Sequence, residues 1–170
     1  MNTKKAGERM ASRKNEKKAG EVVDLFCGVG AISHGFHRAG FNVLAGYDID
    51  PQCKFAFETN NESSFFAQDV AALSGKDVSK HFSGDVPSVL VGCAPCQPFS
   101  SYKQRYEEDP QWALVPRFGE IAAECRPDYV SMENVPRLLE YKDGAIFETF
   151  KSLLEAEGYG VWYSWPAPIE

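Results

Sequence analysis

The residues best suited to covalent chemistry lie in the stretch VGCAPCQPFS, residues 91–100, directly after the apolar run PSVLVG. Cys96 follows Pro95 and stands three residues after Cys93. The two thiols could form a redox pair or half of a zinc site, or Cys96 alone could act as a nucleophile. The other cysteines and the histidines are scattered singly, which disfavours zinc. The residues after Cys96 have the composition of a loop, whereas a redox pair normally leads directly into a helix. A single nucleophile at Cys96 is therefore the favoured hypothesis, with a redox pair as the alternative.

A nucleophilic thiol needs an acid or a base nearby, and Glu133 in the stretch MENV, residues 132–135, is the candidate. Glu133 follows a strand-like apolar segment that we expect to lie beside the strand that precedes Cys96. Both side chains would then face the same crevice. A glutamate at the end of a strand is more often a solvated or capping residue, but its coincidence with two further sites at strand ends favours a functional role.

A glycine turn near the start of the chain could hold a cofactor. The residues Phe26-Cys27-Gly28-Val29-Gly30 follow the apolar segment EVVDLF, and such a turn lets the backbone approach a ligand closely. Asp48 lies 18 residues after Gly30 at the end of the next strand, where a carboxylate can accept hydrogen bonds from a ribose. The third glycine of the dinucleotide fingerprint is absent, so S-adenosylmethionine fits better than NAD. The alternative is a structural turn in which Asp48 caps the following helix.

Strands and helices alternate along the chain and would position these residues. Strands are expected at 21–26, 41–49, 63–69, 86–92 and 127–135, with a further strand from residue 160, and helices at 31–40, 51–60, 112–125 and 144–158. Residues 93–111 are expected to form a long loop. This alternation predicts an α/β fold with a doubly wound, mostly parallel, Rossmann-like sheet. Ligands bind beyond the carboxyl ends of such strands, where Asp48, Asp69 and Glu133 are found.

Composition and charge suit an intracellular globular protein. The chain has 170 residues, five cysteines and a formal net charge of −6, and it contains no apolar run of membrane-spanning length. Residues 1–20 carry seven Lys/Arg and two Glu, which predicts a basic, flexible tail able to contact a phosphate backbone. The remaining residues are acidic and do not by themselves form a nucleic-acid-binding surface.

The stretches DLFCGVG, PCQPFS and MENVPRL occur in this order and at this spacing in the DNA (cytosine-5) methyltransferase family, which the chain resembles over about residues 21–165. The resemblance implies that Cys96 attacks C6 of a cytosine flipped out of double-stranded DNA. It implies that Glu133 holds and protonates the base at N3. The methyl group would come from S-adenosylmethionine, and neither a metal nor a membrane is involved.

The resemblance also assigns a cofactor site and a DNA-facing loop, position by position. The cofactor residues are Phe26, Gly28, Val29, Gly30, Asp48, Ile49, Asp69, Val70, Pro95 and Leu114. Asp48 would hold the ribose and Asp69 the adenine amino group, while Gln97 and Ser100 would lie near the DNA. The chain departs from the family pattern at Ala31, at Ile49, where an aromatic residue is frequent, and at Trp112-Ala113, where Gly-Thr is common.

The family continues with an arginine-bearing strand, a target-recognition domain and a terminal helix, which we do not find in these 170 residues. We therefore expect a basic tail at 1–20 and an N-terminal catalytic subdomain at 21–170, truncated before the last strands. Such a chain would methylate poorly alone. It would be either a piece of a longer enzyme or one chain of a split enzyme whose second chain carries the target-recognition half. The alternatives are a non-catalytic cofactor-binding or interaction module and an RNA cytosine-5 methyltransferase.

Overall fold

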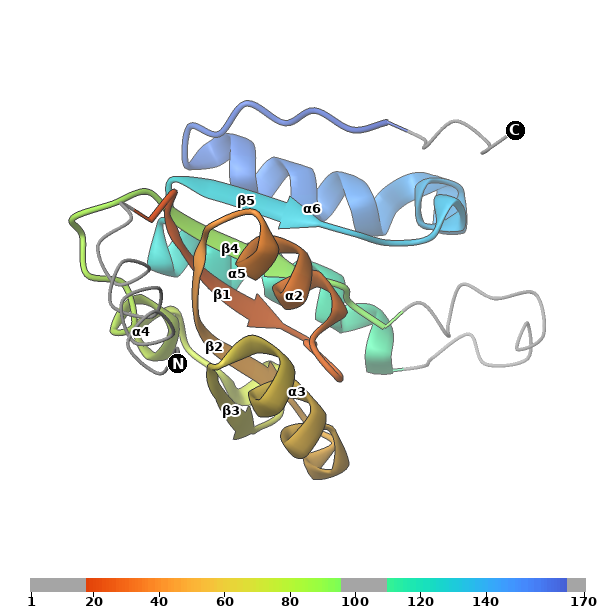
Figure 1. The fold of residues 1–170 in the computed structure, drawn as a ribbon. Helices are drawn as coiled ribbons and strands as arrows, with labels where there is room; N and C mark the ends of the chain where they lie inside the picture. The colour runs from red at the N-terminus through yellow and green to blue at the C-terminus, as the bar shows by residue number, and fades with distance from the viewer. Residues whose placement is uncertain (1–17, 96–109, 165–170) are drawn as a thin grey trace, which may run out of the picture.

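The computed structural model describes residues 18–95 and 110–164, whose strands form a five-stranded sheet (Figure 1). The strands are β1 (Glu21–Leu25), β2 (Asn42–Asp48), β3 (Ser64–Ala67), β4 (Ser88–Gly92) and β5 (Tyr129–Met132). They lie in the order β3-β2-β1-β4-β5, and each neighbouring pair is parallel. The predicted α/β fold with a parallel sheet is confirmed.

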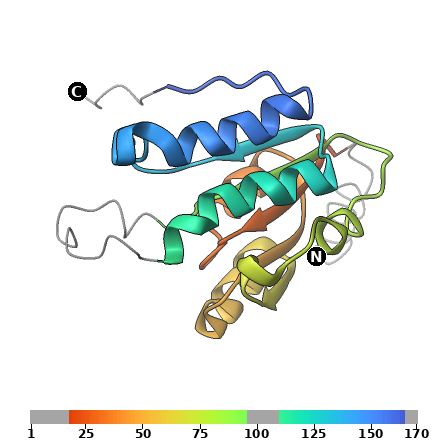
Figure 2. The ribbon, with the colours of Figure 1, turned by 180° about the vertical axis from the view of Figure 1, so that it is seen from behind.

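Helices cover both faces of the sheet. They are α2 (Ala31–Arg38), α3 (Lys54–Asn61), α4 (Gly75–Ser79), α5 (Leu114–Cys125) and α6 (Ala145–Ala156). Helices α2 and α3 lie on the face seen in Figure 1, and α5 and α6 lie on the opposite face, which Figure 2 shows from behind. The chain therefore crosses from one face to the other as it winds through the sheet.

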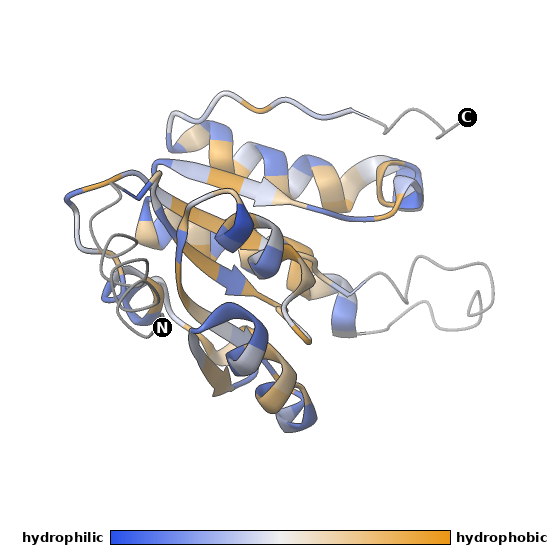
Figure 3. Ribbon diagram, viewed as in Figure 1, coloured by the Kyte–Doolittle hydropathy of each residue, from blue (hydrophilic) through white to orange (hydrophobic). Residues whose placement is uncertain are grey.

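The central strands are buried on both sides, which explains their nearly continuous apolar sequences. All five residues of β1 are buried, as are four of the five in β4. Val22 and Val91 pack in the cluster that contains Phe57 of α3, whereas Leu25 lies in the cluster that contains Phe118 of α5. In Figure 3 the hydrophobic residues accordingly concentrate in the sheet, and hydrophilic residues lie on the outer faces of the helices.

Several elements begin with local signals that refine the predicted boundaries. The helix expected at 51–60 starts with the 3-10 turn Pro51–Cys53, which the Asp50 carboxylate caps by accepting from the Gln52 N–H at 2.9 Å. Helix α4 was not predicted, although Ser74 and Asp77 form a capping box at its start. Further 3-10 turns cover Val70–Ala72, Pro110–Ala113, Pro136–Leu139 and Tyr141–Gly144.

The strand expected from residue 160 is not present in residues 160–164, so this prediction was wrong. A strand needs a neighbouring ladder of backbone partners, and a cavity lined by Tyr129, Val130 and residues 160–163 separates this segment from β5. The Tyr159 hydroxyl instead donates to the Pro127 carbonyl, and the Tyr163 ring packs edge-on against Phe147 with centroids 5.0 Å apart.

Within the described part of the chain, no helix is both long and apolar enough to cross a membrane.

Candidate active site

The glycine turn connects β1 to α2 at the carboxyl end of the sheet. Phe26, Gly28 and Gly30 have φ angles of 59°, 50° and 87°. A Cβ on Gly30 would lie 2.2 Å from Asn61 Nδ2, so α3 packs directly against the turn. A Cβ at Gly28 would meet no atom within 4 Å, and the Val29 side chain is 56% exposed. Gly30 therefore serves the packing of the fold, while Gly28 and Val29 face open space.

Asp48 fixes the turn from the end of β2. Its Oδ2 accepts from the Gly28 N–H at 2.8 Å, and its Oδ1 accepts from the Asp50 N–H at 2.9 Å. Each carboxylate oxygen carries a second lone pair, so Asp48 can still accept hydrogen bonds from a ligand. The neighbouring Ile49 side chain is 70% exposed. The carboxylate is thus oriented by the backbone before any ligand binds.

A cavity of about 510 Å³ lies at this end of the sheet. Seven of the predicted cofactor residues line it: Phe26, Asp48, Ile49, Asp69, Val70, Pro95 and Leu114. Sequence reasoning missed four further lining residues, Ala71, Cys93, Ala94 and Gln111. Gly28, Val29 and Gly30 do not line this cavity and belong to the adjacent turn. The volume and the mixture of apolar walls with two carboxylates are typical of a small-molecule site.

Asp69 forms part of the wall of this cavity, whereas Trp112 lies outside it. The Asp69 carboxylate accepts from the Ala71 N–H at 2.9 Å and so caps the 3-10 turn Val70–Ala72. Trp112, one of the departures from the family pattern, is 9% exposed and packs against Tyr141 with ring centroids 4.5 Å apart. The indole therefore belongs to the core beneath α5, and it does not line the cavity.

The ends of β4 and β5 bring Glu133 beside the residues that precede Cys96. The Glu133 N–H donates to the Gly92 carbonyl at 3.1 Å, and the Asn134 amide donates to the Ala94 carbonyl at 2.9 Å. The Cys93 thiol donates to Glu133 Oε2 at 2.7 Å. Because β4 and β5 are adjacent, as predicted, the Glu133 carboxyl group lies beside the start of the segment that leads to Cys96. Cys96, Gln97 and Ser100 lie outside the described residues.

Asp24 is a functional candidate that sequence reasoning missed. It is 1% exposed near the carboxyl end of β1, and its Oδ2 accepts from the Ser33 hydroxyl of α2 at 2.6 Å. Its Oδ1 is buried without a hydrogen-bond partner. Burial raises the pKa of Asp24 to about 7, although the Ser33 hydrogen bond opposes the rise. The available signal was an aspartate flanked by apolar residues in VVDLF, residues 22–26.

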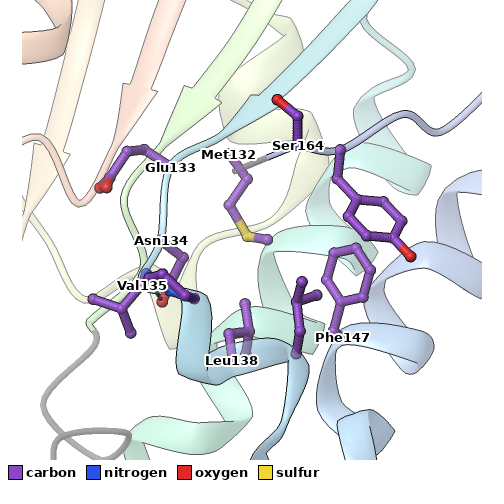
Figure 4. Close-up of a pocket in the computed structure, with 10 residues that line it drawn as sticks. Met132, Glu133, Asn134, Val135, Leu138, Phe147 and Ser164 are labelled. Carbon is purple, nitrogen blue, oxygen red and sulfur yellow. Dashed lines mark hydrogen bonds between the residues drawn. The ribbon is translucent and has the colours of Figure 1, made fainter. Parts of the chain in front are cut away.

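A second cavity, of about 360 Å³, lies on the other side of β5 (Figure 4). Met132 and Phe147 project into it. Tyr163 and Ser164 also line it. The Glu133 carboxyl group is directed away from Phe147 in this view. Most residues around this cavity are apolar, but Glu133, Asn134 and Ser164 also line it. The candidate acid Glu133 therefore borders this cavity and does not line the one that contains Asp48. Among the described residues, no group of three or more His, Cys, Asp or Glu side chains is arranged to hold a metal ion.

Comparison with known proteins identifies the family. The model for C-5 cytosine-specific DNA methylases matches residues 20–165. The chain belongs to this family. The Type II methylase M.HgiDII from Herpetosiphon aurantiacus is 41% identical over 145 residues, which cover 85% of this chain and 41% of that protein. The Type II methyltransferase M.AgeI from Thalassovita gelatinovora is 33% identical, over 82% of this chain and 33% of its own length.

Solved structures of methyltransferases share the fold of this methylase-family chain. A candidate DNA modification methyltransferase encoded within an Escherichia coli prophage superposes with a TM-score of 0.67 at 30% identity, over 80% of this chain and 38% of its own. The Dnmt2 methyltransferase of Schizosaccharomyces pombe superposes with a TM-score of 0.61 at 21% identity, over 82% of this chain and 41% of its own, which is a likeness of fold. The chain thus spans about two fifths of the length of M.HgiDII and of these two structures.

Proposed function

We propose that this chain supplies the cofactor and nucleophile half of a DNA cytosine-5 methyltransferase. The observation that carries the proposal is the cavity of about 510 Å³, because Asp48 and Asp69 line it together with Cys93, Ala94 and Pro95, the residues directly before Cys96. A cofactor in that cavity would lie beside the loop that bears the nucleophile. Membership of the methylase family supports this assignment.

The described residues fit S-adenosylmethionine. The Asp48 carboxylate is held by two backbone N–H groups and keeps lone pairs for a ribose diol. Asp69 is exposed at the edge of the cavity and can accept from an amino group, while Ile49 and Val70 offer apolar surface to an adenine. When bound, S-adenosylmethionine supplies an electrophilic methyl group.

The chain's own residues would then act on a cytosine that has left the duplex. The Cys96 thiolate adds to C6, which makes C5 nucleophilic. Glu133 binds the base at N3 and supplies a proton there, so negative charge does not accumulate on the ring. Once C5 carries the methyl group, solvent water accepts the C5 proton, the bond between C6 and Cys96 breaks to regenerate the thiolate, and N3 returns its proton to Glu133. The role of Cys96 rests on the PCQPFS motif.

Two features support the view that further structure completes the site. β5 pairs with β4, and its other edge faces the cavities lined by residues of β5 and 158–164. Val29 and Ile49 are 56% and 70% exposed beside the cofactor turn. A partner that carries the target-recognition half would add backbone partners along β5 and cover these apolar side chains. DNA as the substrate would place the protein inside the cell.

Reconstitution of methyl transfer tests this function. The chain is mixed with the part of M.HgiDII that lies outside the matched region, and transfer of tritiated methyl groups from S-adenosylmethionine is measured on duplex DNA and on tRNA. We expect label in DNA with the mixture and little with the chain alone. Cys96→Ser should abolish the signal, and Cys53→Ser, a thiol outside the motif, should leave it unchanged.

The other outcomes of this experiment would either indicate a different function or contradict part of the proposal. Label in tRNA but not in DNA would indicate an RNA methyltransferase. Activity that survives Cys96→Ser would contradict the nucleophile. Cofactor binding without any transfer by the mixture would favour a non-catalytic binding module. A full rate from the chain alone would contradict the proposal that it is one half of the enzyme.

A further inference from the structure

Three hydrogen bonds join the last residue of β4 and the residues that follow it to the residues after β5. Two of them involve the backbone, from the Glu133 N–H to Gly92 and from the Asn134 amide to Ala94. The third is made between side chains, because the Cys93 thiol donates to Glu133 Oε2 at 2.7 Å. The proposed mechanism uses Glu133 but has no role for Cys93. The thiol nevertheless contacts the carboxyl group on which that mechanism depends.

Glu133 needs such a contact because its side chain is exposed. An exposed glutamate samples several rotamers, and ordering it on arrival of a base would cost conformational entropy. Glu133 lines the cavity that contains Met132 and Phe147, and in Figure 4 its carboxyl group is directed away from Phe147. Cys93 lines the cavity that also contains Asp48 and Pro95. The thiol therefore joins the Glu133 carboxyl group to a residue of the candidate cofactor cavity.

We propose that Cys93 is a positioning residue whose S–H holds the Glu133 carboxyl group in place for an incoming cytosine and releases it when the base binds. The catalytic meaning of this contact rests on the proposed function. A thiol suits the task because it is a weak hydrogen-bond donor. The base can displace it at little cost, whereas a lysine would form a charge-assisted pair that competes with the substrate.

The contact also has a consequence for Cys93 itself. A carboxylate that accepts from the thiol favours the protonated form and repels a thiolate at the same position. Because the thiolate is the reactive form, Glu133 would keep Cys93 unreactive three residues before the proposed nucleophile. The pair thereby restricts covalent chemistry to Cys96.

Site-resolved alkylation of the 170-residue chain tests the contact. The rate of iodoacetamide addition to Cys93 is followed by mass spectrometry across pH in the parent chain, in Glu133→Gln and in Glu140→Gln. Glu140 is another exposed glutamate of the same segment, so its substitution is a matched control. Cys53 serves as an internal reference thiol, and the buried Cys27 reports whether each variant is folded.

In Glu133→Gln, we expect Cys93 to react about tenfold faster near neutral pH, which corresponds to about one unit on the pH axis. The pH profile of the alkylation rate of Cys93 should move to lower pH, whereas the alkylation rates of Cys53 and Cys27 should be unchanged. Glu140→Gln should behave like the parent chain. An unaltered Cys93 profile in Glu133→Gln would overturn the proposal. Methylation is not needed for this readout, so failure of the proposed function would be seen separately.

A conservative replacement gives a second readout in the reconstituted enzyme. Cys93→Ser retains a donor and should retain the methyl-transfer kcat, whereas Cys93→Ala should lower kcat by about tenfold with an unchanged KM for the cofactor. Equal kcat values for Cys93→Ala and the parent chain would overturn the positioning role.

Discussion

Asp24 places a carboxyl group inside the sheet, directly below the turn that we assign to the cofactor. The group is 1% exposed, and Asp48 raises its pKa further, although burial is the main cause. Ser33, itself fully buried, donates to one of its oxygens, so the pair links β1 to the first turn of α2. A buried carboxyl group with a pKa of about 7 is largely protonated in mildly acid solution and ionises near neutral pH.

Because the Asp24 carboxyl group is buried, we expect the free energy of unfolding to depend on pH. The Asp24→Asn substitution should remove this contribution. The pKa is higher in the folded state than in the unfolded chain, so the folded state binds more protons between about pH 4 and 7. The free energy of unfolding should therefore fall as pH rises through this window, by at most about 4 kcal/mol. Asn keeps an acceptor for Ser33 but does not titrate.

Urea denaturation at pH 5 and pH 8 measures the effect. The fall in unfolding free energy between these two values should be smaller in Asp24→Asn than in the parent chain. Asp85→Asn, which changes an exposed carboxylate at the other end of the sheet, should keep the parental slope. Identical slopes for Asp24→Asn and the parent would show that this carboxyl group does not ionise in that window.

In the turn between β1 and α2, the two glycines have different structural surroundings, although their positions in the sequence look equivalent. Gly30 has φ 87°, and a Cβ there would meet Asn61 and Phe57 of α3 at 2.2 and 2.8 Å. Gly28 has φ 50°, with open space around the position of a Cβ. The same substitution should thus have different consequences at the two positions.

Alanine at Gly30 should lower the free energy of unfolding by about 3 kcal/mol, because strain and overlap with α3 add together. Alanine at Gly28 should cost about 1 kcal/mol, the price of the positive φ alone. Chemical denaturation of the two variants at one pH provides the comparison. A loss at Gly28 equal to or above that at Gly30 would contradict the packing described for this turn.

Local sequence signals account for most elements and for some of the differences. Glycine turns, Pro51 and apolar periodicity predicted the positions of α2, α3, α5 and α6 to within a few residues. Helix α4 was missed because it has five residues, although Ser74-x-x-Asp77 at its start is a capping signal. Val161, Trp162 and Tyr163 favour a strand by type, but strand formation depends on a neighbour that local sequence does not encode.

Across the whole molecule, the order of the elements predicted which residues would meet. Because alternating strands and helices give a parallel sheet, the carboxyl ends of β1, β2, β3 and β4 lie at one end of the sheet, and seven predicted residues line one cavity there. The Cys93–Glu133 and Asp24–Ser33 contacts were not predictable, because they depend on strand register and on side-chain rotamers. The role of Cys96 and the assignment of Asp48 and Asp69 to a cofactor remain predictions.

Calorimetric titration of the 170-residue chain with S-adenosylhomocysteine tests the central claim most directly. The parent chain and Asp85→Asn should bind with a dissociation constant in the micromolar range. Asp48→Asn should weaken binding by at least about tenfold, because a charged acceptor is replaced by a neutral amide. That result would establish Asp48 as part of a formed cofactor site. Equal affinities for Asp48→Asn and the parent chain, or no binding by the parent chain, would contradict the assignment of this cavity to the cofactor.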